Sequence, residues 1–442
     1  MLKTALAGSA IVLLVLAATT RVTGGAQSPA AASSTPTFAR DVAPILHRNC
    51  VVCHRTGEIG PMSLVTFAEA RPWARAIGKA VADGIMPPWH ADAAAGTFEN
   101  ERRLTAAEKD TIARWVAGGA PEGAPATAPA PPALVDGWRI GKPDVVLEMQ
   151  EAYEVPARGT IEYEYFYIPT SFTETKWLKA IEVRPGDRRA VHHVLVYYQA
   201  RPDAATPTGP PAVRGVPEHN RTPERQGRDG ISRNPPRRTP GMQSRLLATY
   251  APGTDPQVFP AGTAVRLAPG GVLELQMHYT ATGTAATDRT KVGLILADAP
   301  PAQEIRPTQF LNGQFTIPAG AADHRVDTSL DFLQDATLWG VFPHTHVRGK
   351  RWSYDLVLPD GTRRTLLSVP RYDFNWQTYY MFREPVQVPK GARLESSAWY
   401  DNSPANRSNP DPAVNVRWGD QTWEEMQYTG VLYSVRSPTA AR

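Results

Sequence analysis

The chain has 442 residues, of which 42% are apolar and 20% are charged, a composition typical of globular domains with sizeable cores. This length predicts two or three domains. The formal net charge is only +4, which argues against a protein that binds nucleic acid through its charge.

The first 26 residues have the layout of an export signal. Lys3 precedes an apolar run from Ala5 to Ala18, and Gly24-Gly25-Ala26 offers a small-residue cleavage site. The run is short for a membrane span, although an uncleaved signal would leave the chain anchored to the membrane. We therefore expect residues 1–26 to be a signal peptide and the rest to be exported, in the periplasm or outside the cell.

The only two cysteines lie in the sequence NCVVCHRTGEIGPM, residues 49–62. The C-x-x-C-H pattern of Cys50, Cys53 and His54 is the attachment signature of one c-type haem, with His54 as the proximal iron ligand. A thioredoxin-like redox pair is the alternative, but the neighbouring sequence lacks the βαβ context that such a pair needs. With both cysteines attached to haem, none is left for a disulfide.

The residues around the motif favour haem. The sequence FARDVAPILHRN, residues 38–49, has helical spacing of its apolar residues and ends at the cysteines. By resemblance to small c-type cytochromes, the carbonyl of Pro61 accepts the ring N–H of His54. Met86 is the expected sixth ligand, and Met62 and His90 are the weaker alternatives.

A second helix closes this unit. Thr105 and Glu108 form a capping box, the residues that follow have one apolar face, and Gly118-Gly119 ends the helix. The order of these features resembles a small cytochrome c and predicts an all-α haem domain over residues 36–120. Residues 121–138 are rich in Ala and Pro, which predicts an extended, semi-rigid linker.

The pattern changes after residue 140. Short segments such as AVHHVLVYYQ, VLELQMHYTA and ATLWGVFPHTH are rich in β-branched and aromatic residues and are bounded by Gly, Pro, Asp and Asn. This pattern predicts two all-β antiparallel, jelly-roll-like sandwiches, over residues 140–300 and 305–437. Residues 202–243 are rich in Pro and Arg and are expected to be a solvated insertion, with a basic docking patch as the alternative.

Several histidines fall in or beside the predicted strands. His344 and His346 alternate along one strand, so both rings point to the same side and can share an ion. His192 and His193 are adjacent, so a shared ion requires a distortion of the strand. His278 lies in a third segment. Such imidazole-rich sites, with a thioether, suit copper, and zinc remains possible.

Four segments, VHHVLVY, LQMHYT, PHTHVRGK and TWEEMQYTGVLY, occur in this order. Together they resemble the type II copper, ascorbate-dependent monooxygenases, the family of peptidylglycine α-hydroxylating and dopamine β-monooxygenases. The resemblance covers residues 140–435. It implies two copper ions, with an electron-transfer site and an oxygen-binding site, whose ligands are respectively His192, His193 and His278, and His344, His346 and Met426.

The resemblance has departures. Two positions that anchor a substrate carboxylate in the peptide-amidating branch are Phe342 and Gly430 here, so a C-terminal glycine is a poor candidate substrate. The combination predicts a copper-dependent monooxygenase that hydroxylates a C–H bond of a small organic substrate with O2. The fused haem would relay the electrons, with an external one-electron donor possible. The alternatives are a haem/copper electron-transfer protein without oxygenase activity, and a zinc-dependent structural or hydrolytic sandwich.

Overall fold

The computed structural model describes residues 35–94, 96–130, 137–201, 213–214, 243–251 and 254–435. The predicted signal peptide, most of the predicted insertion and part of the predicted linker lie outside these residues. Every helix in the described ranges is too short or too polar to cross a membrane. The helical segments are η1 (Phe38–Val42), α1 (Ala43–Asn49), α2 (Phe67–Ala70), η2 (Arg71–Trp73), α3 (Ala74–Ala82), α4 (Ala106–Ala117) and η3 (Pro125–Thr127).

The two predicted helices are confirmed. η1 and α1 run on continuously and end at Cys50. α4 begins with the predicted capping box, in which Thr105 Oγ1 accepts the backbone N–H of Glu108 and the Glu108 carboxylate accepts that of Thr105. The helices pack around Phe38 and Trp115, whose ring centroids lie 6.2 Å apart.

The start of the predicted linker is anchored to the helices. The carbonyl of Pro121 accepts the backbone N–H of Phe38 and the indole N–H of Trp115. Residues 122–128 are exposed, and Pro125–Thr127 form the short helix η3. Residues 131–136 of the linker lie outside the described part of the chain.

The strands described in the structure begin after the helices. They are β1 (Val145–Glu148), β2 (Tyr153–Val155), β3 (Glu164–Pro169), β4 (Lys176–Arg184), β5 (Val191–Ala200), β6 (Val213–Arg214), β7 (Gln243–Tyr250), β8 (Gln257–Val258), β9 (Thr263–Leu267), β10 (Val272–Tyr279), β11 (Ala286–Asp288), β12 (Lys291–Leu296), β13 (Gln303–Asn312), β14 (Thr316–Ile317), β15 (His324–Phe332), β16 (Ala336–His344), β17 (Gly349–Val357), β18 (Arg363–Val369), β19 (Tyr380–Val388), β20 (Arg393–Tyr400), β21 (Val416–Arg417) and β22 (Gln427–Val435).

One sheet runs through both predicted sandwiches, in the order β1-β12-β4-β9-β13-β22-β16-β19, with β8 paired to β4. The join is made by β13, which pairs parallel with β9 and antiparallel with β22. The sheet β3-β10-β5-β7 contributes to the core of the first half, and the sheet β18-β17-β20-β15-β6 to that of the second. The prediction of layered β-domains is confirmed, and the shared sheet was not foreseen.

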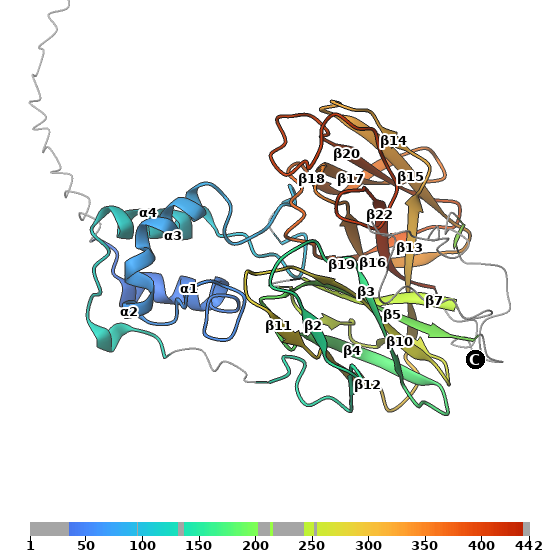
Figure 1. Cartoon of the computed structure of the whole chain (residues 1–442), viewed down its shortest axis with the longest axis horizontal. Coiled ribbons are helices and arrows are strands. Elements are labelled where there is room, and N and C mark those ends of the chain that lie inside the picture. The colour runs from blue at the N-terminus through green and yellow to red at the C-terminus, as the bar shows by residue number, and fades with distance from the viewer. Residues whose placement is uncertain are drawn as a thin grey trace, which may run out of the picture. The chain divides into compact units, whose positions relative to one another are not determined.

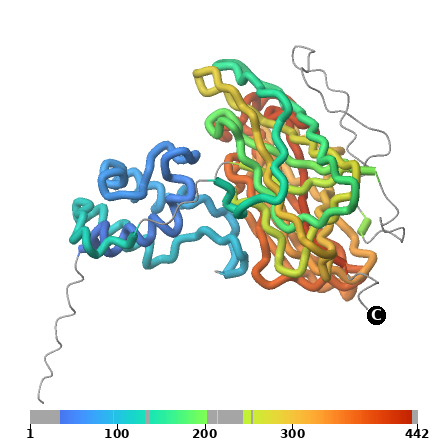
Figure 2. The backbone as a smooth tube through the Cα atoms, turned by 90° about the horizontal axis from the view of Figure 1, so that it is seen from below, coloured from blue at the N-terminus to red at the C-terminus, as the bar shows by residue number. Residues whose placement is uncertain are grey.

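We call residues 145–296 the first β-unit and residues 303–435 the second β-unit. Buried side chains of their strands form two hydrophobic cores, and the first core also includes Phe342, Met426 and Tyr428 of the second β-unit. In Figures 1 and 2 the strands stack in layers and the helices gather in a cluster of their own.

One stretch inside the predicted haem domain packs on the second β-unit. Trp89 and Phe98 contact the ring of Tyr380, with centroids 5.2 and 5.4 Å away. The backbone N–H of Asp92 donates to the carbonyl of Ser368 at 2.8 Å, and Phe98 bridges to Phe382. Residues 89–98 therefore tie the helical segment to the second core.

Candidate metal centres

The first candidate site joins β5 and β10. His193 is directly opposite His278 in the strand register, and the next pair is Val191 with Tyr279, so His192 is an extra, bulged residue. A bulge turns a side chain out of its regular alternation. The ligand atoms of His192, His193 and His278 consequently lie within 4.8 Å of one another, and the distortion that the adjacent histidines require is present.

The three rings of this site are held by partners outside it. His278 Nε2 lies 3.3 Å from the Thr422 hydroxyl, and His193 Nε2 lies 3.4 Å from the Gln377 amide nitrogen. In the part of the chain that the structure describes, Nδ1 of His192 and Nδ1 of His278 are buried without a hydrogen-bond partner. Buried polar atoms of this kind are costly unless they bind something, so Nδ1 is the fitting metal-binding atom of His192 and His278.

The protonation of these rings also suits a metal. Burial lowers the pKa of His278 to about 3 and lowers the pKa of His192, the latter opposed by a hydrogen bond to Asn375. Burial lowers the pKa of His193 as well, and its four histidine neighbours lower it further. The imidazoles are therefore neutral near pH 7, as metal ligands must be.

The second candidate site lies at the end of β16. The rings of His344 and His346 are nearly perpendicular, with centroids 5.2 Å apart. His344 Nδ1 lies 2.5 Å from Gln377 Oε1, and His346 Nδ1 lies 3.0 Å from the carbonyl oxygen of Glu424. A ring whose Nδ1 donates to an oxygen keeps Nε2 for a metal. Burial lowers the pKa of His344 to about 4.

Met426 directly precedes β22, the strand that pairs with β16. His344, the last residue of β16, is opposite Tyr428 in this antiparallel pair. One oxygen of the buried Glu425 carboxylate accepts the backbone N–H groups of both His346, at 2.8 Å, and Met426, at 3.3 Å. Glu425 thus fixes the backbone of two candidate ligands at once.

A loop between β18 and β19 lies between the two sites. We call residues 371–378 the intersite loop. The ring centroid of its Phe374 lies 5.3 Å from that of His193 and 6.0 Å from that of His346. The loop, including Phe374, lines a cleft of about 460 Å³ together with His90.

The C-x-x-C-H segment forms a compact turn after α1. The carbonyl of Cys50 accepts the backbone N–H groups of Cys53 and His54. A Cβ on Gly60 would lie 2.7 Å from His54 Nδ1, so a glycine is needed against the ring. Burial lowers the pKa of His54, and the backbone of Met62 opposes this shift.

The cysteines of this segment are partly buried. Burial raises the pKa of Cys50 to about 12 and also raises that of Cys53. Met62 packs against the hydrophobic cluster of the helices, which Cys50 also contacts. Met86 follows α3 at the point where the chain departs towards the second β-unit, and His90 lines the cleft beside the intersite loop.

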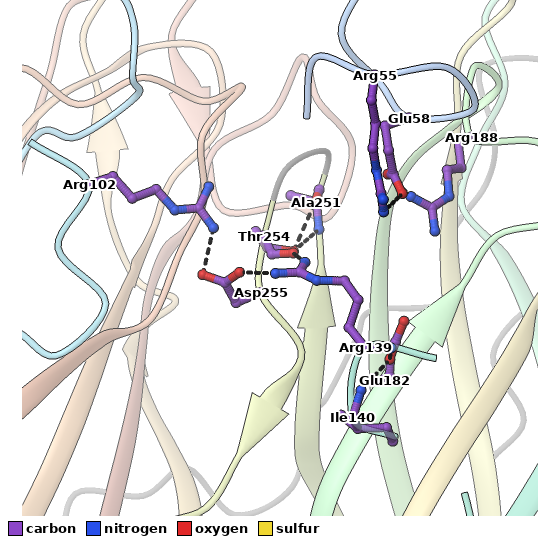
Figure 3. Close-up of polar contacts among 10 residues, drawn as sticks. All are labelled: Arg55, Glu58, Arg102, Arg139, Ile140, Glu182, Arg188, Ala251, Thr254 and Asp255. Carbon is purple, nitrogen blue, oxygen red and sulfur yellow. Dashed lines mark hydrogen bonds and ion pairs between the residues drawn. The ribbon is translucent and has the colours of Figure 1, made fainter. Parts of the chain in front are cut away.

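Ion pairs connect the C-x-x-C-H turn and the helical segment to the first β-unit (Figure 3). Glu58 accepts a hydrogen bond from Arg55 at 3.0 Å and one from Arg188, which lies four residues before His192. Close by, Asp255 pairs with Arg102 at 2.6 Å and with Arg139. The turn is therefore held against the segment that leads into the three-histidine site.

Sequence reasoning missed the residues that orient the ligands. Gln377, Phe374 and Asn375 belong to a loop without strand or motif pattern, and Thr422 lies far from His278 in sequence. The sequence around Gln377, DFNWQT at residues 373–378, has no spacing typical of a strand, a helix or a metal site. Their roles arise from the tertiary fold alone.

No model of a known protein family matches the chain, and no curated protein matches it. The major capsid protein P2 of bacteriophage PM2 is similar over 66% of this chain and 96% of its own, at 11% identity and a TM-score of 0.25. Allantoicase from Saccharomyces cerevisiae is similar over 64% and 81%, at 7% identity and a TM-score of 0.17. The VP2 subviral particle of infectious bursal disease virus is similar over 68% of this chain and 75% of its own, at 11% identity and a TM-score of 0.20. Scores this low carry no functional argument.

Proposed function

We propose that the chain is a copper-dependent monooxygenase that hydroxylates a C–H bond of a small organic substrate with O2. The observation that carries the proposal is the convergence of two ligand sets on neighbouring strands. The three histidines of the first set offer ligand atoms within 4.8 Å of one another. The second set pairs His344 with His346 beside Met426, whose backbone shares the Glu425 carboxylate.

The donor atoms favour copper. Imidazoles with a soft thioether suit Cu(I), whereas zinc sites of enzymes usually include three hard or borderline ligands and a water. Copper, when bound, would supply the one-electron and oxygen chemistry. The protein contributes neutral rings oriented by Thr422, Gln377 and the Glu424 carbonyl.

The proposed division of labour follows the family resemblance. His192, His193 and His278 would hold the electron-transfer copper, and His344, His346 and Met426 the copper that meets oxygen. The position Phe342 is fully buried and stacks on Tyr379, with centroids 4.9 Å apart. It is thus a core residue, and the lack of an anchoring arginine there supports a substrate without a C-terminal glycine carboxylate.

The fused c-type haem would deliver electrons to the first copper. Cys50 and Cys53 would attach the haem, with His54 and Met86 as the proposed axial ligands. The ion pair of Glu58 with Arg188 supports this path because it ties the C-x-x-C-H turn to the segment that leads into the strand of His192. An external one-electron donor would refill the haem, and an exported location would suit such a donor.

Oxygen uptake tests the enzyme directly. A panel of small apolar and aromatic compounds is added to the reduced protein, and substrate-dependent O2 consumption is followed. We expect His344→Ala to abolish hydroxylation while sparing haem reduction. Stopped-flow oxidation of the reduced haem in copper-loaded and copper-free protein tests the relay, and identical rates in the two samples would reject it.

The second candidate function is a haem/copper electron-transfer protein without oxygenase activity. It is favoured by the ion pair of Glu58 with Arg188, because a link between the C-x-x-C-H turn and the segment before the three-histidine site needs no substrate. Haem oxidation that depends on copper, without O2 uptake for any substrate, would identify it. Zinc in both sites would instead support a structural or hydrolytic protein.

A further inference from the structure

Gln377, in the intersite loop, contacts one ring of each candidate metal site. Its side chain is buried. Oε1 lies 2.5 Å from Nδ1 of His344, while Nε2 lies 3.4 Å from Nε2 of His193 and donates to the Phe374 carbonyl at 3.0 Å. The oxygen and the nitrogen of one amide therefore contact two different ligand sets.

The contact with His344 matches the metal-bound form of that ring. An amide oxygen only accepts hydrogen bonds, so the bond at 2.5 Å places a proton on Nδ1 of His344. Nε2 of His344 is then bare and can bind a metal. In this orientation Gln377 supports the second site.

The contact with His193 has the opposite effect. An amide nitrogen only donates, so Nε2 of His193 faces it best without a proton, which places the proton on Nδ1. We take Nδ1 as the metal-binding atom of His193, as in His192 and His278. A metal there moves the proton to Nε2, where it faces the amide N–H. Exchanging the positions of the amide oxygen and nitrogen of Gln377 removes the conflict at His193 but creates the same conflict at His344.

We infer that Gln377 couples the two sites unfavourably, because its single acceptor oxygen suits the metal-bound form of only one site at a time. The inference rests on the proposed function, since it concerns the same two copper sites. Filling one site is expected to weaken copper binding at the other by roughly tenfold, within the usual range of coupling between sites. Gln377 is thus a positioning residue that sets the order of copper loading.

The coupling is measured with Cu(I) titrated anaerobically into the full chain against a competing chelator. His346→Ala leaves only the first site and His278→Ala only the second, and the variant with both changes reports copper taken up elsewhere, including by Cys50 and Cys53. The coupling free energy is a difference. It is the free energy of binding copper to both sites of the unmodified protein, minus the sum of the binding free energies of the two single-site variants. We expect the two sites together to bind roughly tenfold more weakly than the single-site product.

Two substitutions of Gln377 sharpen the test. Gln377→Glu offers two acceptor oxygens, one for each ring N–H, and Gln377→Met of similar shape offers no donor. Both are expected to reduce the coupling to less than about twofold, whereas Gln387→Glu, the same change at an exposed residue of β19, retains it. A merely structural role would instead change the single-site affinities and leave the coupling unaltered.

Additive loading in the unmodified protein, or equal coupling in both Gln377 variants, would overturn the inference. Those results differ from a failure of the proposed function. That failure would appear as a single-site variant that binds no more copper than the double variant.

Discussion

Glu274 provides a quantitative test of the first β-unit. It lies on β10, four residues before His278, and is 8% exposed. Its carboxylate accepts a hydrogen bond from the Gln199 amide, but burial still raises its pKa from 4.5 to about 7. The unfolded chain exposes the carboxyl group and has the ordinary pKa.

The sign of the effect follows from proton binding. Because the folded state holds the proton more tightly, the stabilisation due to Glu274 is complete below about pH 4.5 and is lost as the pH rises through about 7. A shift from 4.5 to about 7 corresponds to about 3 kcal/mol of unfolding free energy. Glu274→Gln removes the ionisation and keeps the shape of the side chain.

Urea unfolding of both proteins from pH 4 to pH 8.5 measures this difference. We expect equal stability near pH 4 and an advantage of about 3 kcal/mol for Glu274→Gln at pH 8.5. Glu154→Gln, at an exposed carboxylate on β2 of the same unit, should follow the unmodified protein throughout. Parallel pH profiles for Glu274→Gln and the unmodified protein would refute the reasoning.

Three further substitutions test the helical segment and its docking. Gly60→Ala places a methyl 2.7 Å from His54 Nδ1 and from the Cys53 carbonyl, an overpacking of about 1–3 kcal/mol; haem per chain, measured as pyridine haemochrome, should fall. Arg188→Gln removes the ion pair with Glu58, worth about 1 kcal/mol, and should slow haem oxidation roughly fivefold in stopped-flow without changing the copper content. Thr105→Ala removes the α4 cap and should lower the stability of the helical segment by about 1 kcal/mol in thermal unfolding.

Local sequence patterns predicted individual strands, helices and caps. The strand bearing His192 and His193, the helix that ends at Cys50 and the capping box of Thr105 all follow from periodicity and from side chains that are near one another in sequence. The distortion required by two adjacent histidines also followed from strand alternation, and the bulge at His192 supplies it.

Long-range pairing could not be predicted in the same way. The parallel contact of β13 with β9 depends on the register of two whole units, and the docking of Trp89 and Phe98 on Tyr380 depends on where the second core presents an open face. Gln377 belongs to neither a strand nor a motif, so its position between two sites depends on how β18 and β19 are placed. Nothing in its own sequence neighbourhood encodes that position.

The most direct test of the central claim is the metal and haem content of the purified, exported protein, with its EPR spectrum. We expect one covalent haem and two copper ions per chain, with nitrogen hyperfine structure from the imidazoles, and one copper ion in either His278→Ala or His346→Ala. Zinc in place of copper, or two copper ions retained in both variants, would contradict two separate histidine-based copper sites.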